Sequence, residues 1–274
     1  MTRWRELLDM TRAIEDLGYD SAWLGEHLLY RWPDRPARGP WEAWSMLSAI
    51  AAVTDRIEFG PLVACTAFHN PALLAKQATT IDEISDGRLI LGLGAGWNET
   101  EFRAFGIPFD HRVDRFEEAF TIIRTLLQEG EIDFEGRYYQ ARDCEILPRG
   151  PRPGGPPLMI GSNGPRMLSI ALPHADWWNT WYVDYGNTPE GFAELNAKIS
   201  EAAERAGRDP AEIKRSACAH VIVDPANPER EIDAPPVSLD GFRDHLQALG
   251  EAGADEVIVV AGPINEASIR ALLQ

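Results

Sequence analysis

The feature of the sequence that most constrains its fold is a repeated alternation of helical segments with short apolar segments. Longer stretches indicate helices at residues 41–54, 71–84, 114–129, 189–207 and 239–253. The short apolar segments between and around them read DSAWLGEH, RIEFGPLV, RLILGLG, PLMIGS, HADWWNT, RSACAHVIV and DEVIVV. Near-continuous apolar strands that alternate with helices predict a parallel sheet covered by helices.

The number of apolar segments indicates which parallel sheet the chain forms. Seven strands are predicted, whereas a closed (β/α)8 barrel has eight. The chain begins with a helical segment where a first strand would be expected. We therefore expect an α/β fold, a TIM (β/α)8 barrel that lacks the first strand in this chain. We favour a start further upstream over an open barrel, because an unpaired parallel edge exposes backbone groups. The barrel is expected to form a single domain over residues 1–274, with a hairpin excursion near 131–157.

Three glycines at every second position, Gly92, Gly94 and Gly96, end the run RLILGLGAGW. A dinucleotide-binding fingerprint needs G-x-G-x-x-G directly before a helix in the first unit of its domain, whereas at least two predicted strands precede this run. Alternate glycines on a strand point to one side of it and leave room there for another group. The run therefore indicates a nearby ligand or a crowded barrel interior rather than a dinucleotide site.

The composition narrows the class of protein further. The formal net charge of the 274 residues is −17, which argues against nucleic acid or an anionic membrane as a partner. The sequence has no apolar stretch long enough to span a bilayer and no signal-peptide core at its start, so a cytoplasmic protein is expected. The three cysteines do not form a disulfide or zinc pattern, and no two histidines have the spacing of metal ligands, so no metal site is predicted.

Several short motifs occur in a characteristic order along the chain. They are GYDSAWLGEH, HNP, SDGRLILGLGAGW with an E-x-x-x-F-G segment behind it, EGRYY, PLMIGSNGPR and HADWWN. In order and spacing, the set resembles the bacterial luciferase-like flavin and deazaflavin oxidoreductases, and most of all their branch that depends on coenzyme F420. The resemblance implies a TIM barrel that holds its cofactor at the C-terminal ends of the strands and transfers a hydride without a metal.

Glu26 and His27 close the segment DSAWLGEH, at the expected active face of the barrel. The alternative is that both are ordinary polar residues that cap a loop. An imidazole at a strand end can donate to a ring carbonyl or hold a substrate proton, and the resemblance places a histidine-type residue beside the cofactor ring. Glu26 and His27 are therefore the predicted catalytic residues.

The run GSNGPR, residues 161–166, ends one strand and opens a helix. Small residues there can present backbone N–H groups to an anion, with help from the helix dipole. A plain tight turn is the alternative. The resemblance assigns the coenzyme phosphate to this loop, with contacts from Gly161, Ser162, Asn163 and Gly164 and charge pairing from Arg166. Such an anchor suits FMN as well as F420.

Tryptophans gather at or just past the strand ends, where an indole can stack on a flat ring. Trp97 and Trp178 are the predicted pocket residues, and core packing accounts for at least half of the group. Cys65 lies close to the predicted ring position and is expected to be a pocket wall, since no helix N-terminus or base is evident that would activate its thiol.

The segment GPLVACTAFHNP, residues 60–71, makes the most specific prediction. Its strand reaches the active face with no turn residue, yet the chain must swing outward to reach Pro71. By resemblance to deazaflavin-dependent members, a bulge with a non-proline cis peptide bond at Leu62–Val63 presses on one face of the ring. Leu62, Val63 and Cys65 then become cofactor contacts. The alternative is a trans strand end with Val63 in the core.

These observations predict an oxidoreductase that transfers a hydride between F420 and an unidentified small organic substrate. An FMN-dependent luciferase-like monooxygenase, supplied with reduced flavin by a reductase partner, is the alternative within the class. A non-catalytic flavin-binding or degenerate barrel protein is the alternative from another class, and a metal-dependent barrel hydrolase lacks its ligands. The resemblance also implies a homodimer formed through barrel helices.

Overall fold

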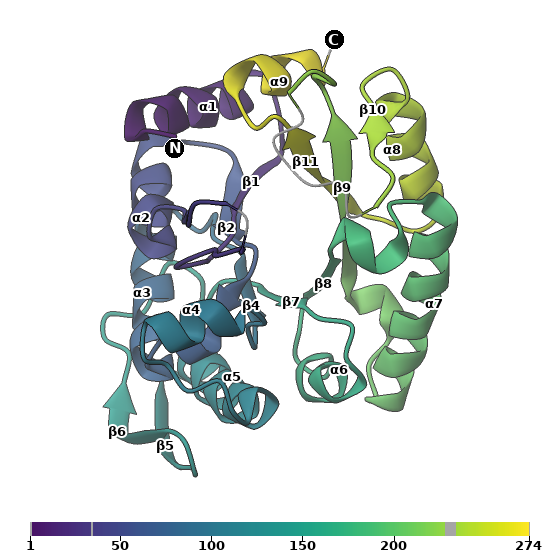
Figure 1. Cartoon of the computed structure of the whole chain (residues 1–274). Helices are drawn as coiled ribbons and strands as arrows, with labels where there is room; N and C mark the ends of the chain where they lie inside the picture. Colours follow the sequence, from purple (N-terminus) through teal and green to yellow (C-terminus); the bar gives the residue numbers. More distant parts are fainter. Residues whose placement is uncertain (1, 34, 228–233, 274) are drawn as a thin grey trace. The chain divides into compact units, whose positions relative to one another are not determined.

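A computed structural model describes residues 2–33, 35–227 and 234–273, and their contacts form two compact units. The first unit comprises residues 20–158, and the second comprises residues 2–19 together with the chain from residue 159 onward. Figure 1 colours the elements of both units along the sequence. Strands alternate with helices in both units, as the sequence predicts.

The first unit is built on two pairs of parallel strands. β1 (Ser21–Leu24) pairs with β2 (Glu58–Pro61), and β3 (Ala64–Cys65) pairs with β4 (Leu91–Gly94). Because parallel strands end at the same edge, the residues that follow β1, β2 and β4 are brought together.

Helices cover one side of these strands, and Figure 1 shows α2 and α3 stacked along that side. Both have capped starts, since the side chains of Glu42 and Asn70 accept hydrogen bonds from backbone N–H groups of the first turn. The helices of this unit include α2 (Ala43–Val53), α3 (Pro71–Ile84), α4 (Glu99–Ala104) and α5 (Arg112–Gln128).

An antiparallel hairpin follows α5. Its strands are β5 (Glu131–Glu135) and β6 (Gln140–Glu145), which pair with an irregularity after Ile132. The carboxylate of Glu118 on α5 accepts hydrogen bonds of 2.7, 2.8 and 2.9 Å from the backbone N–H groups of residues 137, 138 and 139. One carboxylate therefore ties the hairpin turn to the preceding helix.

Arg88 connects the end of α2 to the start of β4. Its guanidinium donates hydrogen bonds to the backbone carbonyl oxygens of residues 51, 54, 57 and 85 and to Oγ1 of Thr54. Asp86 and Gly87 turn the chain before it, with φ of 54° and 80°. The SDGR motif thus satisfies carbonyl groups at a helix end that would otherwise lack donors.

Two of the alternate glycines, Gly92 in β4 and Gly96 in the loop after it, are required by close packing. A Cβ atom on Gly92 would overlap the carbonyl oxygen of Pro61 and lie 3.0 Å from Cγ1 of Val63. At Gly96, where φ is +75°, a Cβ atom would lie 2.5 Å from Sγ of Cys65. The glycines therefore make room for the end of β2 and the residues after it.

The second unit contains a parallel sheet, and Figure 1 shows α7 beside β8 and β9. Its strands in spatial order are β7 (Leu158–Gly161), β8 (Trp177–Thr180), β9 (Lys214–Ile222) and β11 (Glu256–Gly262), and the short β10 (Val237–Ser238) also pairs with β9. The helices of this unit include α1 (Trp4–Asp16), α6 (Pro165–Ala171), α7 (Pro189–Arg205), α8 (Phe242–Glu251) and α9 (Glu266–Ala271).

Helix α1 belongs to the second unit although it comes first in the chain. Met10 and Ala13 form a small core with Ile269 of α9, and the hydroxyl of Tyr19 donates to the carbonyl oxygen of Ile269 at 2.7 Å. Strand β1 comes after this helix, in the order that the sequence predicts.

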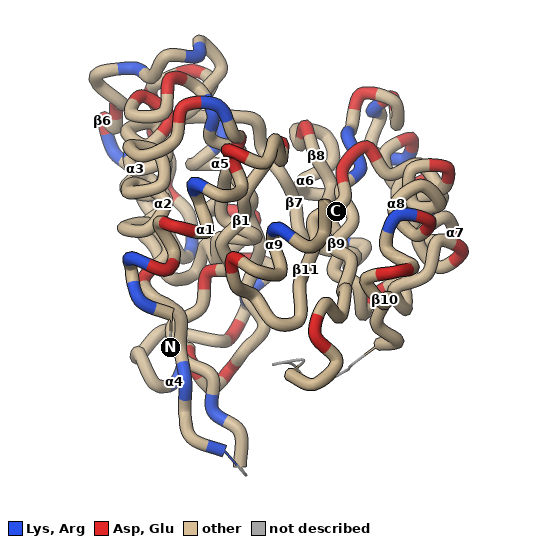
Figure 2. Tube along the Cα trace, turned by 90° about the horizontal axis from the view of Figure 1, so that it is seen from above, with Lys and Arg blue, Asp and Glu red and all other residues tan. Residues whose placement is uncertain are grey.

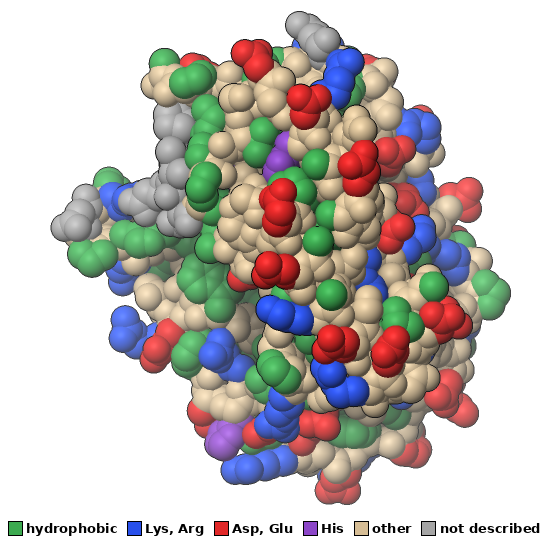
Figure 3. Space-filling model, turned by 90° about the vertical axis from the view of Figure 1, so that its right-hand side faces the viewer, with side chains coloured by type: hydrophobic (Ala, Val, Ile, Leu, Met, Phe, Trp, Pro, Cys, Tyr) green, Lys and Arg blue, Asp and Glu red, His purple; other side chains and the backbone are tan. Residues whose placement is uncertain are grey.

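Charged residues are distributed over both units (Figure 2). Figure 3 shows acidic side chains, interspersed with basic ones, over the face on which α7 and α8 lie. On α7, Glu194, Glu201 and Glu204 are exposed whereas Phe192 and Ile199 are buried, which is the pattern of a helix packed on a sheet. None of the helices in the described part of the chain combines the length and the apolar character that a bilayer crossing requires.

Candidate active site

His27 follows β1 and pairs with a carboxylate that the sequence alone did not single out. Its Nδ1 lies 3.0 Å from Oε1 of Glu101, on α4. The other carboxylate oxygen of Glu101 accepts hydrogen bonds from the backbone N–H groups of Leu28 and Leu29, at 2.8 and 3.3 Å. The side chain of Glu101 is 2% exposed and that of His27 is 19% exposed. One buried carboxylate therefore fixes the loop after β1 to α4.

This pairing determines how the imidazole of His27 carries its proton. A buried carboxylate beside Nδ1 favours the tautomer with hydrogen on that nitrogen, which leaves a lone pair on Nε2. Within the described ranges of the chain, Nε2 of His27 has no hydrogen-bond partner. His27 is thus oriented as a base whose accepting nitrogen can meet a small molecule.

Glu26 has different surroundings from its neighbour in the sequence. It is 5% exposed, and its carboxylate accepts hydrogen bonds from Nε1 of Trp44, the backbone N–H of Cys65 and Nε2 of His69, at 2.8, 2.7 and 2.8 Å. Three donors engage this buried group. The carboxylate therefore fixes the segment after β2, and the catalytic role of Glu26 stays a prediction.

The peptide bond between Leu62 and Val63 is cis, as the resemblance to deazaflavin-dependent proteins predicts, and the trans alternative is excluded. The bond lies in a bulge between β2 and β3, where the backbone N–H of Leu62 donates to the carbonyl oxygen of Leu24 at 2.7 Å. Leu62 and Val63 are partly exposed, whereas Ala64 and Cys65 are buried. The bulge therefore presents an apolar surface.

The loop that carries His27 passes beside this bulge at Gly25. A Cβ atom on Gly25 would be 3.8 Å from the carbonyl oxygen of Leu62 and 3.9 Å from Cδ2 of His27. The ring of Trp97, which is 65% exposed, meets the imidazole edge-on at a centroid distance of 5.7 Å. An imidazole, an apolar bulge and an exposed indole are thus gathered beyond the ends of β1, β2 and β4.

Cys65 lies behind this surface. Burial raises the pKa of its thiol to about 12, so the group is protonated at neutral pH. The position of Gly96 leaves room for its Sγ. These surroundings suit a wall of the site and not a nucleophile.

The predicted phosphate loop, residues 161–166, follows β7 in the second unit. Its Gly164 is exposed, and a Cβ atom there would meet only Oγ of Ser162, at 3.8 Å. The amide nitrogen of Asn163 donates to Oγ1 of Thr180 at 3.1 Å and to Oδ2 of Asp184 at 2.9 Å. Burial raises the pKa of Asp184 above the ordinary value. The loop therefore contains open backbone at Gly164, while the amide donors of Asn163 are directed at an acid.

Arg166 and Gly161 complete this loop, and Trp178 lies behind it. Arg166 is exposed at the start of α6, and Gly161 ends β7. Trp178 is 0% exposed, and its Nε1 donates to the carbonyl oxygen of Ser162 at 3.1 Å. A fully buried indole cannot present a face to a ligand, so the expectation that Trp178 stacks on the cofactor is corrected to support of the loop.

The candidate residues therefore fall into two groups, one in each unit. His27, Leu62, Val63 and Trp97 lie together in the first unit, whereas the loop at residues 161–166 lies in the second. Sequence reasoning missed Glu101, although the E-x-x-x-F-G motif that begins with it was a usable signal. Among the residues that the structure describes, no group of three or more His, Cys, Asp or Glu side chains is arranged to hold a metal ion.

Parallel strands that alternate with helices and carry polar residues beyond their C-terminal ends define an α/β protein of the TIM-barrel type. The family model described as luciferase-like monooxygenase matches residues 1–260. The chain therefore belongs to the luciferase-like monooxygenase family, which confirms the resemblance seen in the sequence motifs.

Two relatives illustrate the range of this family. The chain is 34% identical, over 62% of its length, to the pyrimidine monooxygenase RutA of Caulobacter sp. strain K31. It is 33% identical, over 77% of its length, to the F420-dependent glucose-6-phosphate dehydrogenase of Intrasporangium calvum. These alignments cover 48% and 63% of the two relatives, so the chain spans between about half and somewhat under two thirds of their length.

A solved structure agrees in fold. The coenzyme F420-dependent tetrahydromethanopterin reductase from Methanopyrus kandleri superposes with a TM-score of 0.80, covering 100% of this chain and 94% of that chain at 21% identity. The likeness shows the luciferase-like TIM-barrel fold and confirms the predicted fold class.

Proposed function

We propose that the protein is an F420-dependent oxidoreductase that transfers a hydride between the deazaflavin and a small organic substrate, with His27 moving the substrate's proton. The observation that carries this proposal is the pairing of the partly exposed His27 with the buried carboxylate of Glu101, in a loop that passes the apolar bulge at Leu62 and Val63. The F420-dependent relative also aligns with more of this chain than the pyrimidine monooxygenase does, 77% against 62%.

The residues of the first unit fit a flat deazaflavin ring. Leu62 and Val63 are partly exposed apolar side chains that follow a buried strand end, and Trp97 is exposed near them. Apolar and aromatic walls with a few polar groups are typical of cofactor sites. Leu62, Val63 and Trp97 would hold the ring. By the resemblance, the loop at residues 161–166 in the second unit is taken separately as a phosphate-binding loop.

When bound, F420 supplies a two-electron centre that accepts or donates a hydride. Glu101 holds the Nδ1–H of His27 and keeps Nε2 as an acceptor. Nε2 can then take the hydroxyl proton of an alcohol whose carbon gives up a hydride, or return a proton to a carbonyl oxygen in the reverse direction. The carboxylate of Glu101 stabilises the imidazolium that results, and Glu26 keeps the bulge in place through the N–H of Cys65.

An FMN-dependent monooxygenase is the second candidate. The 34% identity to a pyrimidine monooxygenase favours it, and the loop at residues 161–166 suits the phosphate of FMN as well. A protein of this type would receive reduced flavin from a reductase partner. A flavin-binding protein without turnover is the third candidate. Such a protein needs no oriented base, so it does not account for the pairing of His27 with Glu101.

Titration of the purified protein with F420 and with FMN, followed by quenching of tryptophan fluorescence, distinguishes these candidates. We expect saturable binding of F420 and weaker binding of FMN. Val63→Glu should abolish binding of the ring, whereas Leu73→Glu, at a position of α3 that is 57% exposed, should leave it unchanged.

Each outcome of the titration has a distinct meaning. Tighter binding of FMN would favour the monooxygenase, and binding of neither compound would overturn both enzyme proposals. A third outcome is that F420 binds but no small alcohol of a panel reduces it and no matching carbonyl compound reoxidises the reduced form. This outcome would favour a flavin-binding protein that has no turnover.

Other parts of the proposal rest on the family. The family model spans both units, which supports one functional domain over residues 1–274. A homodimer is proposed on the resemblance alone, and a single monomeric species in analytical sedimentation would refute it.

A further inference from the structure

The loop after β1 carries a cluster of arginine and aromatic side chains, which we name the arginine hairpin (residues 28–33 and 35–40). Tyr30 and Arg38 form an antiparallel bridge, in which their backbone N–H groups donate to each other's carbonyl oxygens at 2.6 and 3.0 Å. Nδ2 of Asn98 donates to the carbonyl oxygen of Leu29 at 2.9 Å. Figure 2 shows basic positions on both arms of this projecting loop. The hairpin is thus anchored beside His27.

A ladder of rings connects His27 to the arginines. The imidazole and the ring of Tyr30 have centroids 4.5 Å apart, and Tyr30 stacks on Trp32 at 5.3 Å with an interplanar angle of 8°. The guanidinium of Arg38 lies over Tyr30 at 5.8 Å and over Trp32 at 5.1 Å, and that of Arg35 lies over Trp32 at 5.4 Å. Arg38 is therefore held over the ring that adjoins His27.

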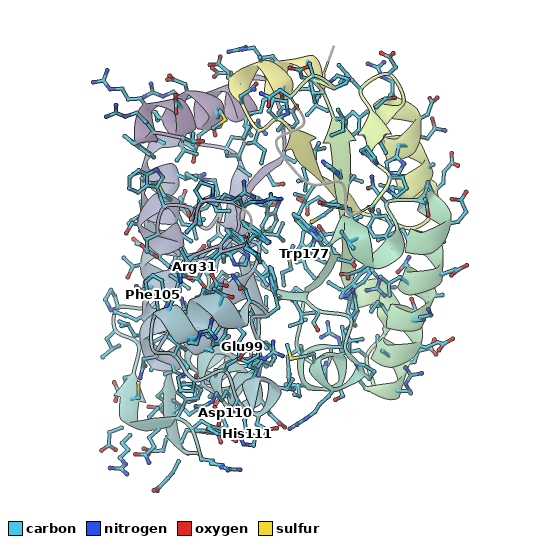
Figure 4. All side chains as sticks on the ribbon, viewed as in Figure 1. Arg31, Glu99, Phe105, Asp110, His111 and Trp177 are labelled. Carbon is cyan, nitrogen blue, oxygen red and sulfur yellow. The ribbon has the colours of Figure 1, made fainter. Side chains whose placement is uncertain are left out.

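A guanidinium that stacks on a ring keeps its N–H groups available for hydrogen bonds to another molecule. A ring occupies the face of the guanidinium, while its N–H groups lie in the plane and point away from the ring. Arg31, labelled in Figure 4, and Arg38 are both exposed, and within the described residues neither forms an ion pair with a carboxylate. An exposed guanidinium that stacks on the rings next to a histidine base therefore indicates a site for an external anion.

We propose that the arginine hairpin recognises an anionic group of the substrate, a carboxylate or a phosphate, and thereby selects small alcohols that carry such a group. The proposal rests on the proposed function, because His27 is taken as the base for the same substrate. Arg38 binds the anion through two parallel N–H groups. Arg38 and His27 both lie against Tyr30, at 5.8 and 4.5 Å from its ring centroid, so one small substrate can meet both.

Binding of simple anions tests the site without cofactor or turnover. Malonate or inorganic phosphate is added at constant ionic strength while tryptophan fluorescence is recorded, and Trp32→Phe identifies the part of the signal that comes from the hairpin. We expect saturable binding that Arg38→Gln weakens about tenfold or more. Arg38→Lys, which keeps the charge but loses the fork, should bind with intermediate affinity. Arg142→Gln is the matched control, since it removes one charge from β6, where Arg142 is 69% exposed.

The preference between the probes identifies the anion, because tighter binding of malonate indicates a carboxylate substrate and tighter binding of phosphate indicates a phosphorylated one. Absence of saturable binding, or equal affinities in Arg38→Gln and Arg142→Gln, would overturn the inference.

A second source of carboxylates is the acidic tail of F420. If Arg38→Gln weakens binding of F420 but not of the deazaflavin without its phosphate and tail, the hairpin binds the cofactor tail and the inference is wrong. Failure of F420 to bind the wild-type protein while malonate or phosphate still binds would refute the proposed function and leave the anion site standing.

Discussion

The pairing of His27 with Glu101 predicts that Glu101→Gln changes which ring nitrogen of His27 carries hydrogen. A glutamine amide offers one acceptor oxygen and one donor nitrogen in place of two acceptor oxygens. Its oxygen is expected to keep the N–H groups of Leu28 and Leu29, which leaves its nitrogen facing Nδ1 of His27. Nδ1 then becomes an acceptor, the hydrogen moves to Nε2, and the base loses its lone pair.

The contacts of Glu101 set the size of the effect. The wild-type carboxylate makes one hydrogen bond to the imidazole and two to backbone N–H groups, and its side chain is 2% exposed. Glutamine keeps the backbone bonds and loses the charge, which costs about 1.5–3 kcal/mol of unfolding free energy. Glu101→Ala leaves two buried N–H groups without acceptors and costs more, about 1–3 kcal/mol for each group. Proton transfer by His27 should slow by ~10²–10⁴ in either variant.

Nitrogen-15 NMR of histidine-labelled protein measures this tautomer directly and needs no substrate. We expect hydrogen on Nδ1 of His27 in the wild type and on Nε2 in Glu101→Gln, with a lower melting temperature. Glu99→Gln is the control, because Glu99 lies exposed on the same helix (Figure 4). Identical His27 tautomers and equal melting temperatures in the wild type and Glu101→Gln would refute the reasoning.

The remaining predictions concern Glu26, the phosphate loop and Asp184. Glu26→Gln should lower the free energy of unfolding in urea by about 1–3 kcal/mol, because an amide cannot accept from all three donors; an unchanged unfolding midpoint would contradict this. Gly164→Asp should weaken coenzyme binding in the fluorescence titration about tenfold or more, because a carboxylate would stand where an anion must approach the loop; equal affinities would place the anion elsewhere. Burial raises the pKa of Asp184, so its contribution to stability is full below the ordinary carboxyl pKa and is lost as pH rises through the raised value. Asp184→Asn should therefore be the more stable protein near neutral pH and not in acid, which melting temperatures from about pH 4 to about pH 8 would show; parallel curves would exclude it.

The elements of the fold could be predicted because they depend on local pattern. The helix at residues 71–84 begins with a proline at its first position and ends where the apolar spacing ends, and α3 has those bounds. The bulge at Leu62–Val63 could be predicted only through the resemblance, because neither residue type indicates a cis peptide bond.

Side-chain contacts between distant parts of the chain could not be predicted in the same way. Glu101 lies 74 residues beyond His27 and on a helix of 6 residues, which is too short to show a periodic signal. Trp97 and Trp178 both lie at or just past strand ends, yet one is 65% exposed and the other 0%. The difference arises because Trp178 lies within β8, packed against Phe192 of α7, whereas Trp97 lies in the loop after β4.

The close packing of Gly92 and Gly96 has a consequence for how such a site can diversify. A side chain at either position would collide with the carbonyl oxygen of Pro61 or with the sulfur of Cys65, so selection for a new ligand cannot act through these positions without moving the backbone. Leu62 and Val63 are partly exposed and can change in size while the strand beneath them stays constant. A combinatorial library at Leu62 and Val63 should therefore yield folded variants with altered ligand preference, whereas the same diversity at Gly92 and Gly96 should yield mostly unfolded chains.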